Sequence, residues 1–184
     1  MKRNLAGRLR TLRALVLDVD GVLTDGGLYY AESGEEMKRF DVRDGQGLVL
    51  LREAGILVAL VTRKTSRLVI RRAQDLGITE VHQNATDKRA VVESLLARHK
   101  IPLAAACFIG DDLGDLPAMA SVALAAAPAD AIKEVRAAAA IITKATAGHG
   151  AVRELCDQIL SARKGKRPPP ERRTMRRPGD EREG

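Results

Sequence analysis

Acidic side chains gather at two places in the sequence, and each group directly follows an apolar run. Residues 18–25 read DVDGVLTD after the run that begins at Ala14, and residues 110–115 read GDDLGD after the run that ends at Ile109. Burying several like charges is costly unless a cation or solvent compensates them. Mg²⁺ takes carboxylate oxygens and substrate phosphate oxygens together. The two groups therefore predict a magnesium site, with Asp111 as a ligand of the ion or of its water.

Each acidic group also has an ordinary interpretation. A lone Asp-x-Asp at a strand end is commonly a pair of solvated acids, and Asp112 or Asp115 would equally serve to cap a following helix. The continuation Gly-Val-Leu-Thr-Asp after Asp20 favours the functional interpretation of the first group.

Two single residues could bind phosphate beside these acids. Thr62 follows an apolar run, and its hydroxyl could donate to a phosphate oxygen; Lys88 begins an amphipathic stretch and offers an ammonium. Taken singly, such a Thr is more often a cap or turn residue, and such a Lys is usually solvated. The order DxDGxxT, Thr, Lys, GDDxxD is more specific than any one of its parts. The sequence has no GxxxxGK loop, the other common phosphate cradle.

Short apolar runs predict the strands that must position these residues. Each is nearly continuous in Val, Leu, Ile or Ala, as strands covered on both faces are. The predicted strands are residues 14–19, 56–61, 78–82, 105–109, 122–125 and 140–142. Amphipathic stretches predict helices over residues 46–54, 66–76, 87–100, 113–120, 130–137 and 150–162. Gly55 and Gly77 are predicted to end helices, and Ser66, Asp87 and Asp130 to begin them.

This alternation predicts an α/β fold, a Rossmann-like, mostly parallel sheet with helices on both faces. Ligands bind such sheets beyond the carboxyl ends of the strands, where the acidic groups and Thr62 fall. Residues 27–42 break the rhythm and predict a β-hairpin around Ser33-Gly34, too small for a second domain. The expected organisation is a basic N-terminal arm (1–11), one domain (12–162) and a disordered, basic, Pro-rich tail (163–184).

The composition restricts the classes of function. The chain has 184 residues, of which 45% are hydrophobic and 2% aromatic, which suits one soluble domain and argues against a nucleic-acid binder that stacks bases. The net charge of +7 comes from the two ends, because the segment between them is net negative. Cys107 and Cys156 suggest no disulfide framework, and no apolar run approaches the roughly 18 residues of a membrane span. We expect a cytoplasmic protein without a membrane or nucleic-acid partner.

Over residues 12–160 the ordered motifs resemble the haloacid dehalogenase superfamily of phosphohydrolases. The resemblance implies that Asp18 is the nucleophile and forms an aspartyl-phosphate. Asp20 would protonate the leaving oxygen and then assist the attack of water. Further implied roles are Mg²⁺ binding by Asp18, the backbone carbonyl of Asp20 and Asp111, and phosphate binding by Thr62 and Lys88.

Five runs narrow the resemblance to the 3-deoxy-D-manno-octulosonate 8-phosphate phosphatases, a family that includes phosphatases of related nonulosonate 9-phosphates. The runs are residues 18–30 (DVDGVLTDGGLYY), 34–38 (GEEMK), 40–45 (FDVRDG), 110–116 (GDDLGDL) and 150–156 (GAVRELC). The resemblance implies a minimal cap made of the β-hairpin, a homotetramer whose hairpins help close adjoining sites, and a place in lipopolysaccharide biosynthesis. The substrate, a phosphorylated sugar acid, would meet Asp20, Asp41, Val42, Arg43, Asp44, Gly45, Thr62, Lys64, Arg72 and Lys88.

Two loops depart from the family pattern. Thr62-Arg63-Lys64 stands where relatives commonly read Thr-Gly-Arg, and a lysine lacks the bidentate fork of an arginine. Gln83-Asn84 stands where relatives read Gln-Gly. The exact sugar acid, with eight or nine carbons, therefore stays open. So do two alternatives, a binding module of this fold without turnover and a nucleic-acid role for the basic ends.

Overall fold

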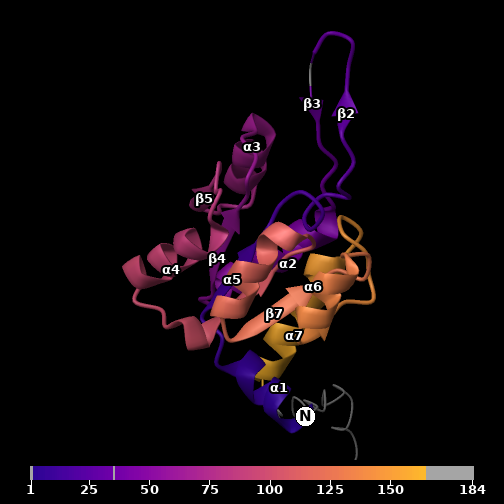
Figure 1. The fold of residues 1–184 in the computed structure, drawn as a ribbon. Helices are drawn as coiled ribbons and strands as arrows, with labels where there is room; N and C mark the ends of the chain where they lie inside the picture. The colour runs from indigo at the N-terminus through magenta and orange to yellow at the C-terminus, as the bar shows by residue number, and fades with distance from the viewer. Residues whose placement is uncertain (1, 35, 165–184) are drawn as a thin grey trace, which may run out of the picture.

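The centre of the fold is a six-stranded sheet in which every strand runs parallel to its neighbours, in the order β5-β4-β1-β6-β7-β8. The structure is a computed structural model that describes residues 2–34 and 36–164, with side chains from residue 5 onward. The strands are β1 (Ala14–Leu17), β4 (Leu57–Val61), β5 (Glu80–His82), β6 (Ala106–Ile109), β7 (Leu124–Ala127) and β8 (Ile141–Ile142). The predicted α/β class and its parallel sheet are confirmed (Figure 1).

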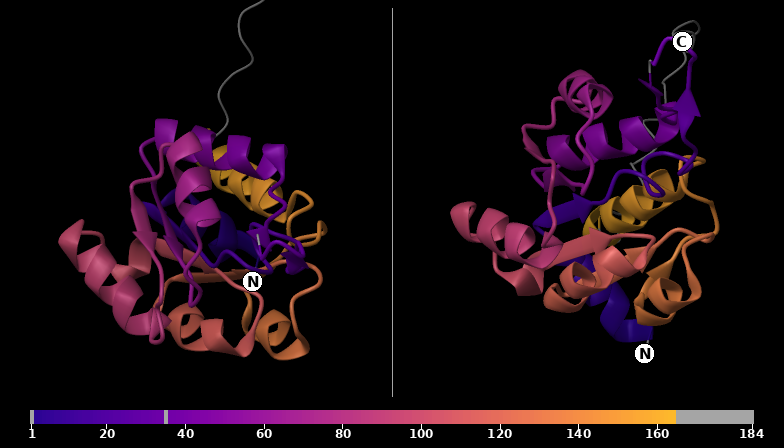
Figure 2. Two further views of the ribbon diagram at one scale, coloured as in Figure 1. Left: turned by 90° about the horizontal axis from the view of Figure 1, so that it is seen from above. Right: turned by 45° about the horizontal axis from the view of Figure 1, so that its top comes forward.

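Helices cover both faces of this sheet, as predicted (Figure 2). They are α1 (Lys2–Arg10), α2 (Val42–Glu53), α3 (Arg67–Asp75), α4 (Lys88–Arg98), α5 (Leu116–Ser121), α6 (Lys133–Ala138) and α7 (Ala151–Lys164), with short 3-10 turns η1 (Leu103–Ala105) and η2 (Leu113–Asp115). Successive strand residues face opposite sides, so Leu15 and Leu17 pack with α1, α2, α3 and α7, whereas Ala14 and Val16 pack with α4, α5 and α6. Both layers of the core are aliphatic, and Phe108 is the large aromatic side chain buried among them.

The start of α2 differs from the prediction. The helix begins at Val42 rather than at residue 46, because the carboxylate of Asp41 accepts a hydrogen bond from the backbone N–H of Arg43 (2.7 Å) and so caps the first turn. Residues expected to line a substrate pocket, Val42 to Gly45, therefore form the first turn of a helix.

The other predicted helix ends are mostly confirmed. Gly55 and Gly77 follow α2 and α3 with positive φ angles of 76° and 64°. Asp87 caps α4 through the N–H of Ala90 (3.0 Å), whereas Ser66 precedes α3 without a side-chain cap. The prediction for Asp130 is wrong: α6 begins at Lys133, and the Asp130 carboxylate instead accepts the N–H of Ala147 (2.9 Å).

The two ends of the domain pack together. Residues 2–10 form α1, for which the sequence pattern predicts no helix; Leu9 is buried and Leu5 packs against the same core cluster as α7. Of the predicted tail over residues 163–184, Arg163 and Lys164 belong to α7, and the rest lies outside the described residues. None of the described helices is long and apolar enough to cross a membrane.

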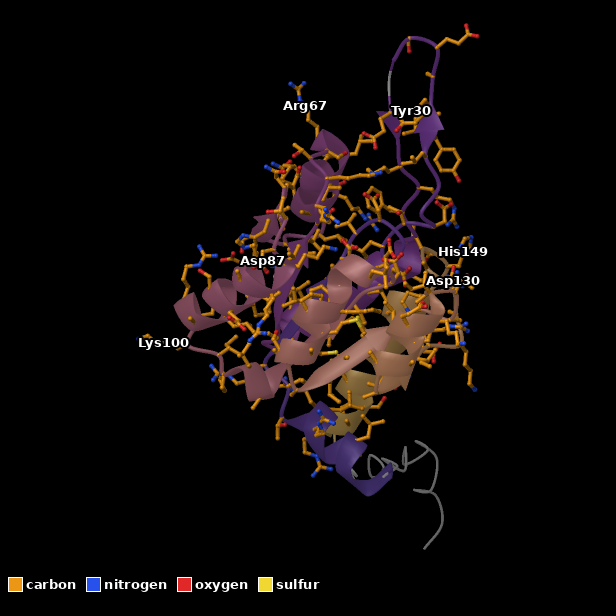
Figure 3. All side chains as sticks on the ribbon, viewed as in Figure 1. Tyr30, Arg67, Asp87, Lys100, Asp130 and His149 are labelled. Atoms are coloured by element: carbon orange, nitrogen blue, oxygen red, sulfur yellow. The ribbon has the colours of Figure 1, made fainter. Side chains whose placement is uncertain are left out.

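A hairpin stands where the sequence predicts one. Strand β2 (Tyr29–Tyr30) pairs antiparallel with β3 (Glu36–Met37), and this hairpin projects away from the body of the domain (Figure 1). Tyr30 is the last residue of β2 before the turn, and Arg67 lies at the end of α3 that points the same way (Figure 3). The hairpin exposes the large apolar side chains of Leu28, Tyr30 and Met37. An exposed group of this kind often marks a contact surface.

Candidate active site

The three central strands bring the predicted motifs to one edge of the sheet. Leu17 pairs in register with both Leu60 and Ile109, so β1, β4 and β6 end at nearly the same level. Asp18, Thr62 and Gly110-Asp111 follow these strand ends, and Lys88 approaches from the start of α4. One cavity of about 180 Å³ is lined by Asp18, Asp20, Thr62, Arg63, Lys64, Lys88, Asp111, Asp112, Gly114 and Asp115.

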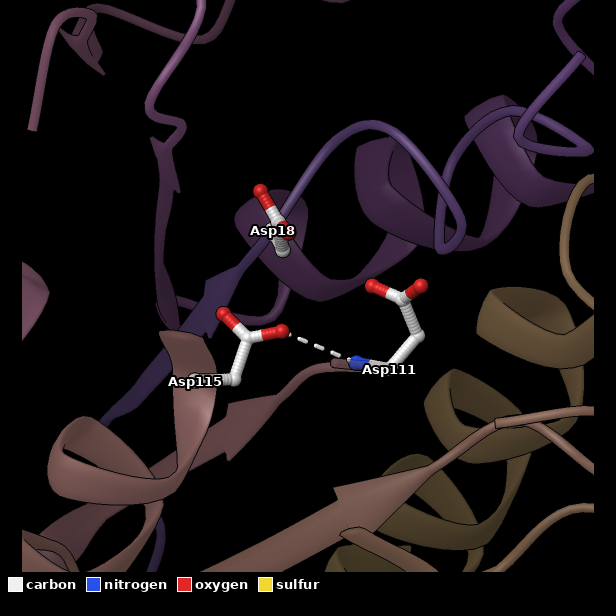
Figure 4. A group of neighbouring side chains, drawn as sticks. All are labelled: Asp18, Asp111 and Asp115. Atoms are coloured by element: carbon white, nitrogen blue, oxygen red, sulfur yellow. Dashed lines mark hydrogen bonds between the residues drawn. The ribbon is translucent and has the colours of Figure 1, made fainter. Parts of the chain in front are cut away.

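Carboxylates of Asp18, Asp111 and Asp115 form a close cluster in this cavity (Figure 4). One oxygen from each lies within 4.8 Å of the others, near the roughly 4.2 Å that separates two ligands on opposite sides of one Mg²⁺. Among the described residues, the buried side-chain oxygens without a hydrogen-bond partner are Asp111 Oδ1 and Asp20 Oδ2. Of these two residues Asp111 belongs to the carboxylate cluster, and its buried oxygen without a partner suits a cation ligand. The acids present therefore fit a magnesium ion.

Lys88 joins two of these acids. Its Nζ lies 2.7 Å from Asp18 Oδ2 and 2.6 Å from Asp115 Oδ1, and its side chain is only 4% exposed. Burial alone would lower the pKa of Lys88, but Asp18 and Asp115 outweigh it and raise the pKa above its ordinary value. Lys88 is therefore a fixed positive charge between the carboxylates of Asp18 and Asp115.

Asp115 orients the loop that carries Asp111. Its Oδ2 accepts the backbone N–H of Asp111 (2.9 Å) and that of Asp112 (3.2 Å), while its Oδ1 accepts Lys88. Asp112 in turn accepts the N–H of Leu113 (2.7 Å) and forms a reciprocal capping box with Asp115. The capping interpretation thus holds for Asp112 and Asp115, and Asp111 is left to face the cavity.

Crowding of negative charge changes the titration of the two candidate ligands. Burial, with the nearby charge of Asp115, raises the pKa of Asp18 to about 6, although Lys88 opposes the shift. Burial, followed by the charges of Asp18 and Asp115, raises the pKa of Asp111 to about 7. Each carboxylate is destabilised by burial and by its acidic neighbours, and a cation would relieve both.

Gly21 allows the first motif to approach Asp111. It has a φ of +84°, and a Cβ atom at this position would lie 2.1 Å from Asp111 Oδ2. Only glycine therefore fits between the two acidic groups. The departure at Asn84 is accommodated in a related way, because Asn84 has a φ of 54°, a conformation that asparagine adopts more readily than most residues.

The Thr62-Arg63-Lys64 loop forms one wall of the cavity. The side chain of Thr62 is buried, and its Oγ1 accepts the N–H of Lys64 (3.3 Å), which leaves the hydroxyl hydrogen free to be donated to a phosphate oxygen. Arg63 and Lys64 are exposed, and Arg63 lies beside Gly114 on the opposite loop. Two exposed cationic side chains therefore line the same cavity as the acidic cluster.

Lys38 is a site residue that the sequence analysis missed. It comes from the hairpin leg after β3, and its Nζ lies 2.5 Å from Asp20 Oδ1 and 3.2 Å from Glu36 Oε1. Burial alone would lower its pKa, but the hydrogen bonds to the two carboxylates outweigh burial and raise it. The run GEEMK contains Lys38, but no spacing rule links it to an aspartate 18 positions earlier.

Comparisons with known proteins agree with this geometry. A family model described as haloacid dehalogenase-like hydrolase matches residues 61–155. The 3-deoxy-D-manno-octulosonate 8-phosphate phosphatase of Yersinia pestis is 43% identical over 155 residues, which cover 84% of this chain and 83% of the relative. The Escherichia coli K12 enzyme of the same name is 40% identical over 159 residues, covering 86% and 85%. The chain belongs to the haloacid dehalogenase-like hydrolases, in the 3-deoxy-D-manno-octulosonate 8-phosphate phosphatase family.

Solved structures of this family share the fold. The Yersinia pestis phosphatase matches with a TM-score of 0.86 at 42% identity, over 88% of this chain and 87% of that one. The Moraxella catarrhalis phosphatase, solved in complex with a magnesium ion, a phosphate ion and a KDO molecule, matches with a TM-score of 0.87 at 36% identity, over 89% and 94%. The family expected from the sequence is confirmed.

A second group of predicted site residues lies at the start of α2 and does not line the cavity. Asp41 is paired with Arg43 (3.0 Å), whose hydrogen bond is the main cause that lowers the pKa of Asp41 to about 2. Val42 is 80% exposed. Gly45 is packed against Arg72, which donates to the backbone carbonyl of Asp41 (3.1 Å).

Asp44 contacts the start of α7 and does not line the cavity. It is fully buried, and its two carboxylate oxygens accept the N–H groups of Gly150 (3.2 Å) and Arg153 (2.7 Å) at the start of α7. Within this chain Asp44 therefore caps α7. The substrate roles inferred for these α2 residues and for Arg72 stay predictions.

Proposed function

We propose that this protein is a magnesium-dependent phosphatase that hydrolyses 3-deoxy-D-manno-octulosonate 8-phosphate. The observation that carries the proposal is the convergence of Asp18, Asp111 and Lys88 in one cavity, where Asp111 Oδ1 has no partner among the described residues. Relatives of 40–43% identity carry the name of this activity, and one related structure holds magnesium, phosphate and KDO.

Asp18 is the proposed nucleophile. One of its carboxylate oxygens forms a bond to phosphorus while the bond between phosphorus and the sugar oxygen breaks. The backbone N–H of Val19 holds Asp18 Oδ1 (2.7 Å) and Lys88 holds Oδ2, so the carboxylate is fixed in direction before the substrate arrives. Lys88 and the Thr62 hydroxyl would then bind the oxygens of the transferring group.

Asp20 is the proposed acid and base. It lines the same cavity two residues after Asp18 and would give a proton to the leaving sugar oxygen. In the second step it would take a proton from water as the water attacks phosphorus, which releases inorganic phosphate and restores the Asp18 carboxylate. Mg²⁺, held by Asp18, Asp111 and the backbone carbonyl of Asp20, would supply the charge that offsets repulsion between Asp18 and the phosphate dianion.

Assembly into a homotetramer in the cytoplasm is also part of the proposal. The apolar surface of the hairpin, at Leu28, Tyr30 and Met37, supports contact with another copy of the chain. Buried, unpaired Cys107 and Cys156 are compatible with a reducing compartment.

Phosphate release tests the function. The purified protein is given a panel of eight- and nine-carbon sugar-acid phosphates, with Mg²⁺ or with EDTA, beside Asp18→Asn as control. We expect magnesium-dependent release that is fastest with 3-deoxy-D-manno-octulosonate 8-phosphate and absent in Asp18→Asn. Faster release from a nine-carbon substrate would transfer the assignment to that substrate. No release from any of them would support a binding module without turnover.

A further inference from the structure

Lys38 makes the closest polar contact to the proposed acid and base. Its Nζ lies 2.5 Å from Asp20 Oδ1, and the lysine side chain is 2% exposed although it comes from the projecting hairpin. The other oxygen, Asp20 Oδ2, is buried and has no hydrogen-bond partner among the described residues. The two oxygens of Asp20 are therefore inequivalent.

This inequivalence decides where a proton can lie on Asp20. A lysine ammonium has three donors and no acceptor, so it can bind Oδ1 only while Oδ1 accepts. The proton of a neutral Asp20 must then lie on Oδ2. In the first chemical step, the sugar oxygen takes the electron pair of the breaking bond to phosphorus and the proton from Oδ2.

We propose that Lys38 is a positioning residue that holds Asp20 Oδ1 and thereby presents Oδ2 as the oxygen that exchanges protons with the leaving group and with water. The inference rests on the proposed function and adds to it a role for the hairpin. The hairpin delivers Lys38, and Glu36 of β3 holds the same ammonium at 3.2 Å. A displacement of the hairpin would therefore disturb proton transfer directly.

A comparison of leaving groups distinguishes this role from a structural one. The sugar alkoxide needs a proton as it leaves, whereas the phenolate of p-nitrophenyl phosphate does not. We expect Lys38→Met to lower kcat/KM for the sugar-acid phosphate by about 100-fold, within the range of general acid catalysis, and that for p-nitrophenyl phosphate by less than about threefold. Lys38→Arg, which keeps a donor-only cation, should recover most of the loss.

Three further variants complete the test. Asp20→Asn should show the same dependence on the leaving group, and adding Lys38→Met to it should cause no further loss, because the two act as one unit. Arg39→Met is the matched control: Arg39 is the next residue on the same leg and donates to the carbonyl of Gly148 (2.6 Å), away from Asp20. It should leave the ratio of the two kcat/KM values unchanged. Lys38→Gln replaces Lys38→Met if the latter lacks a cooperative thermal transition.

The outcomes separate this inference from the proposed function. Equal losses with both substrates, an unchanged sugar-phosphate rate, or losses that add to those of Asp20→Asn would overturn the role of Lys38 while leaving the phosphatase in place. A wild-type protein that releases phosphate from neither substrate would overturn the proposed function itself.

Discussion

Replacement of Lys88 by methionine tests how much the buried ion pairs of the site contribute to stability and to catalysis. Lys88 Nζ lies 2.7 Å from Asp18 and 2.6 Å from Asp115, and all three side chains are nearly buried. Methionine keeps most of the volume but removes the charge. Two carboxylates would then be left close together without the cation that now lies between them, and with no Mg²⁺ they would repel each other.

The magnitude follows from these distances. At an effective dielectric constant of about 20, each contact is worth roughly 6 kcal/mol of attraction before the cost of burying the charges is subtracted. Breaking a buried ion pair by removing one partner typically costs about 3–5 kcal/mol net. For a chain of this length, each kcal/mol lowers Tm by about 2–4 °C, so we expect a fall of roughly 6–20 °C.

Thermal denaturation with EDTA and with Mg²⁺ provides the assay. Because Mg²⁺ would place positive charge beside Asp18, the rise in Tm on adding Mg²⁺ should be larger in Lys88→Met than in the wild type. Lys133→Met, at an exposed lysine on α6, is the matched control and should stay within about 0.5 kcal/mol of the wild type. Loss of the cation beside the transferring phosphate should also lower kcat by about 100- to 1,000-fold.

Two results would refute this reasoning. A Tm of Lys88→Met within about 2 °C of the wild type in EDTA would mean that the buried charges are not held by Lys88. A response to Mg²⁺ smaller than that of the wild type would mean that the cation does not bind beside Asp18.

Three other perturbations have definite expected outcomes. Gly21→Ala should abolish the stabilisation by Mg²⁺ and lower Tm, because its Cβ would lie 2.1 Å from Asp111 Oδ2 at a φ of +84°; an unchanged Mg²⁺ response in thermal denaturation would contradict this. Burial and acidic neighbours raise the pKa of Asp18 to about 6 and that of Asp111 to about 7, so the folded protein binds more protons than the unfolded chain between about pH 4 and pH 7. In EDTA the stability of the protein should therefore rise on acidification from about pH 8 to about pH 5.5. The rise should be smaller in Asp111→Asn. Asp44→Ala should cost about 1–3 kcal/mol in urea denaturation, because it leaves the N–H groups of Gly150 and Arg153 without their acceptor; a cost below about 0.5 kcal/mol would argue against the cap.

The sheet and the site residues that follow its central strands were predictable because they depend on local pattern. Apolar runs such as Val58 to Val61 identify parallel strands, and a parallel sheet brings the residues after neighbouring strands together whatever the helices do. Asp18, Thr62 and Asp111 converge for this reason. The turn at Asn84 is likewise compatible with its sequence, because asparagine tolerates a positive φ angle.

Features set by tertiary contacts were not predictable in this way. Helix α1 is rich in arginine and forms where Leu5 and Leu9 meet the core beside α7. Asp130 has the chemistry of a helix cap, but the N–H of Ala147 competes for it. Lys38 reaches Asp20 only because the second leg of the hairpin returns to the domain beside the first acidic motif. In each case a partner distant in sequence decides the outcome.

A phosphoryl group on Asp18 is the most direct test of the central claim. The protein is mixed with 3-deoxy-D-manno-octulosonate 8-phosphate and Mg²⁺, quenched in acid during turnover, and digested for peptide mass mapping. We predict a phosphoryl group on the peptide that contains Asp18, at the aspartate itself, and none in Asp18→Asn. Phosphate release without any such adduct, or an adduct that persists in Asp18→Asn, would contradict the account.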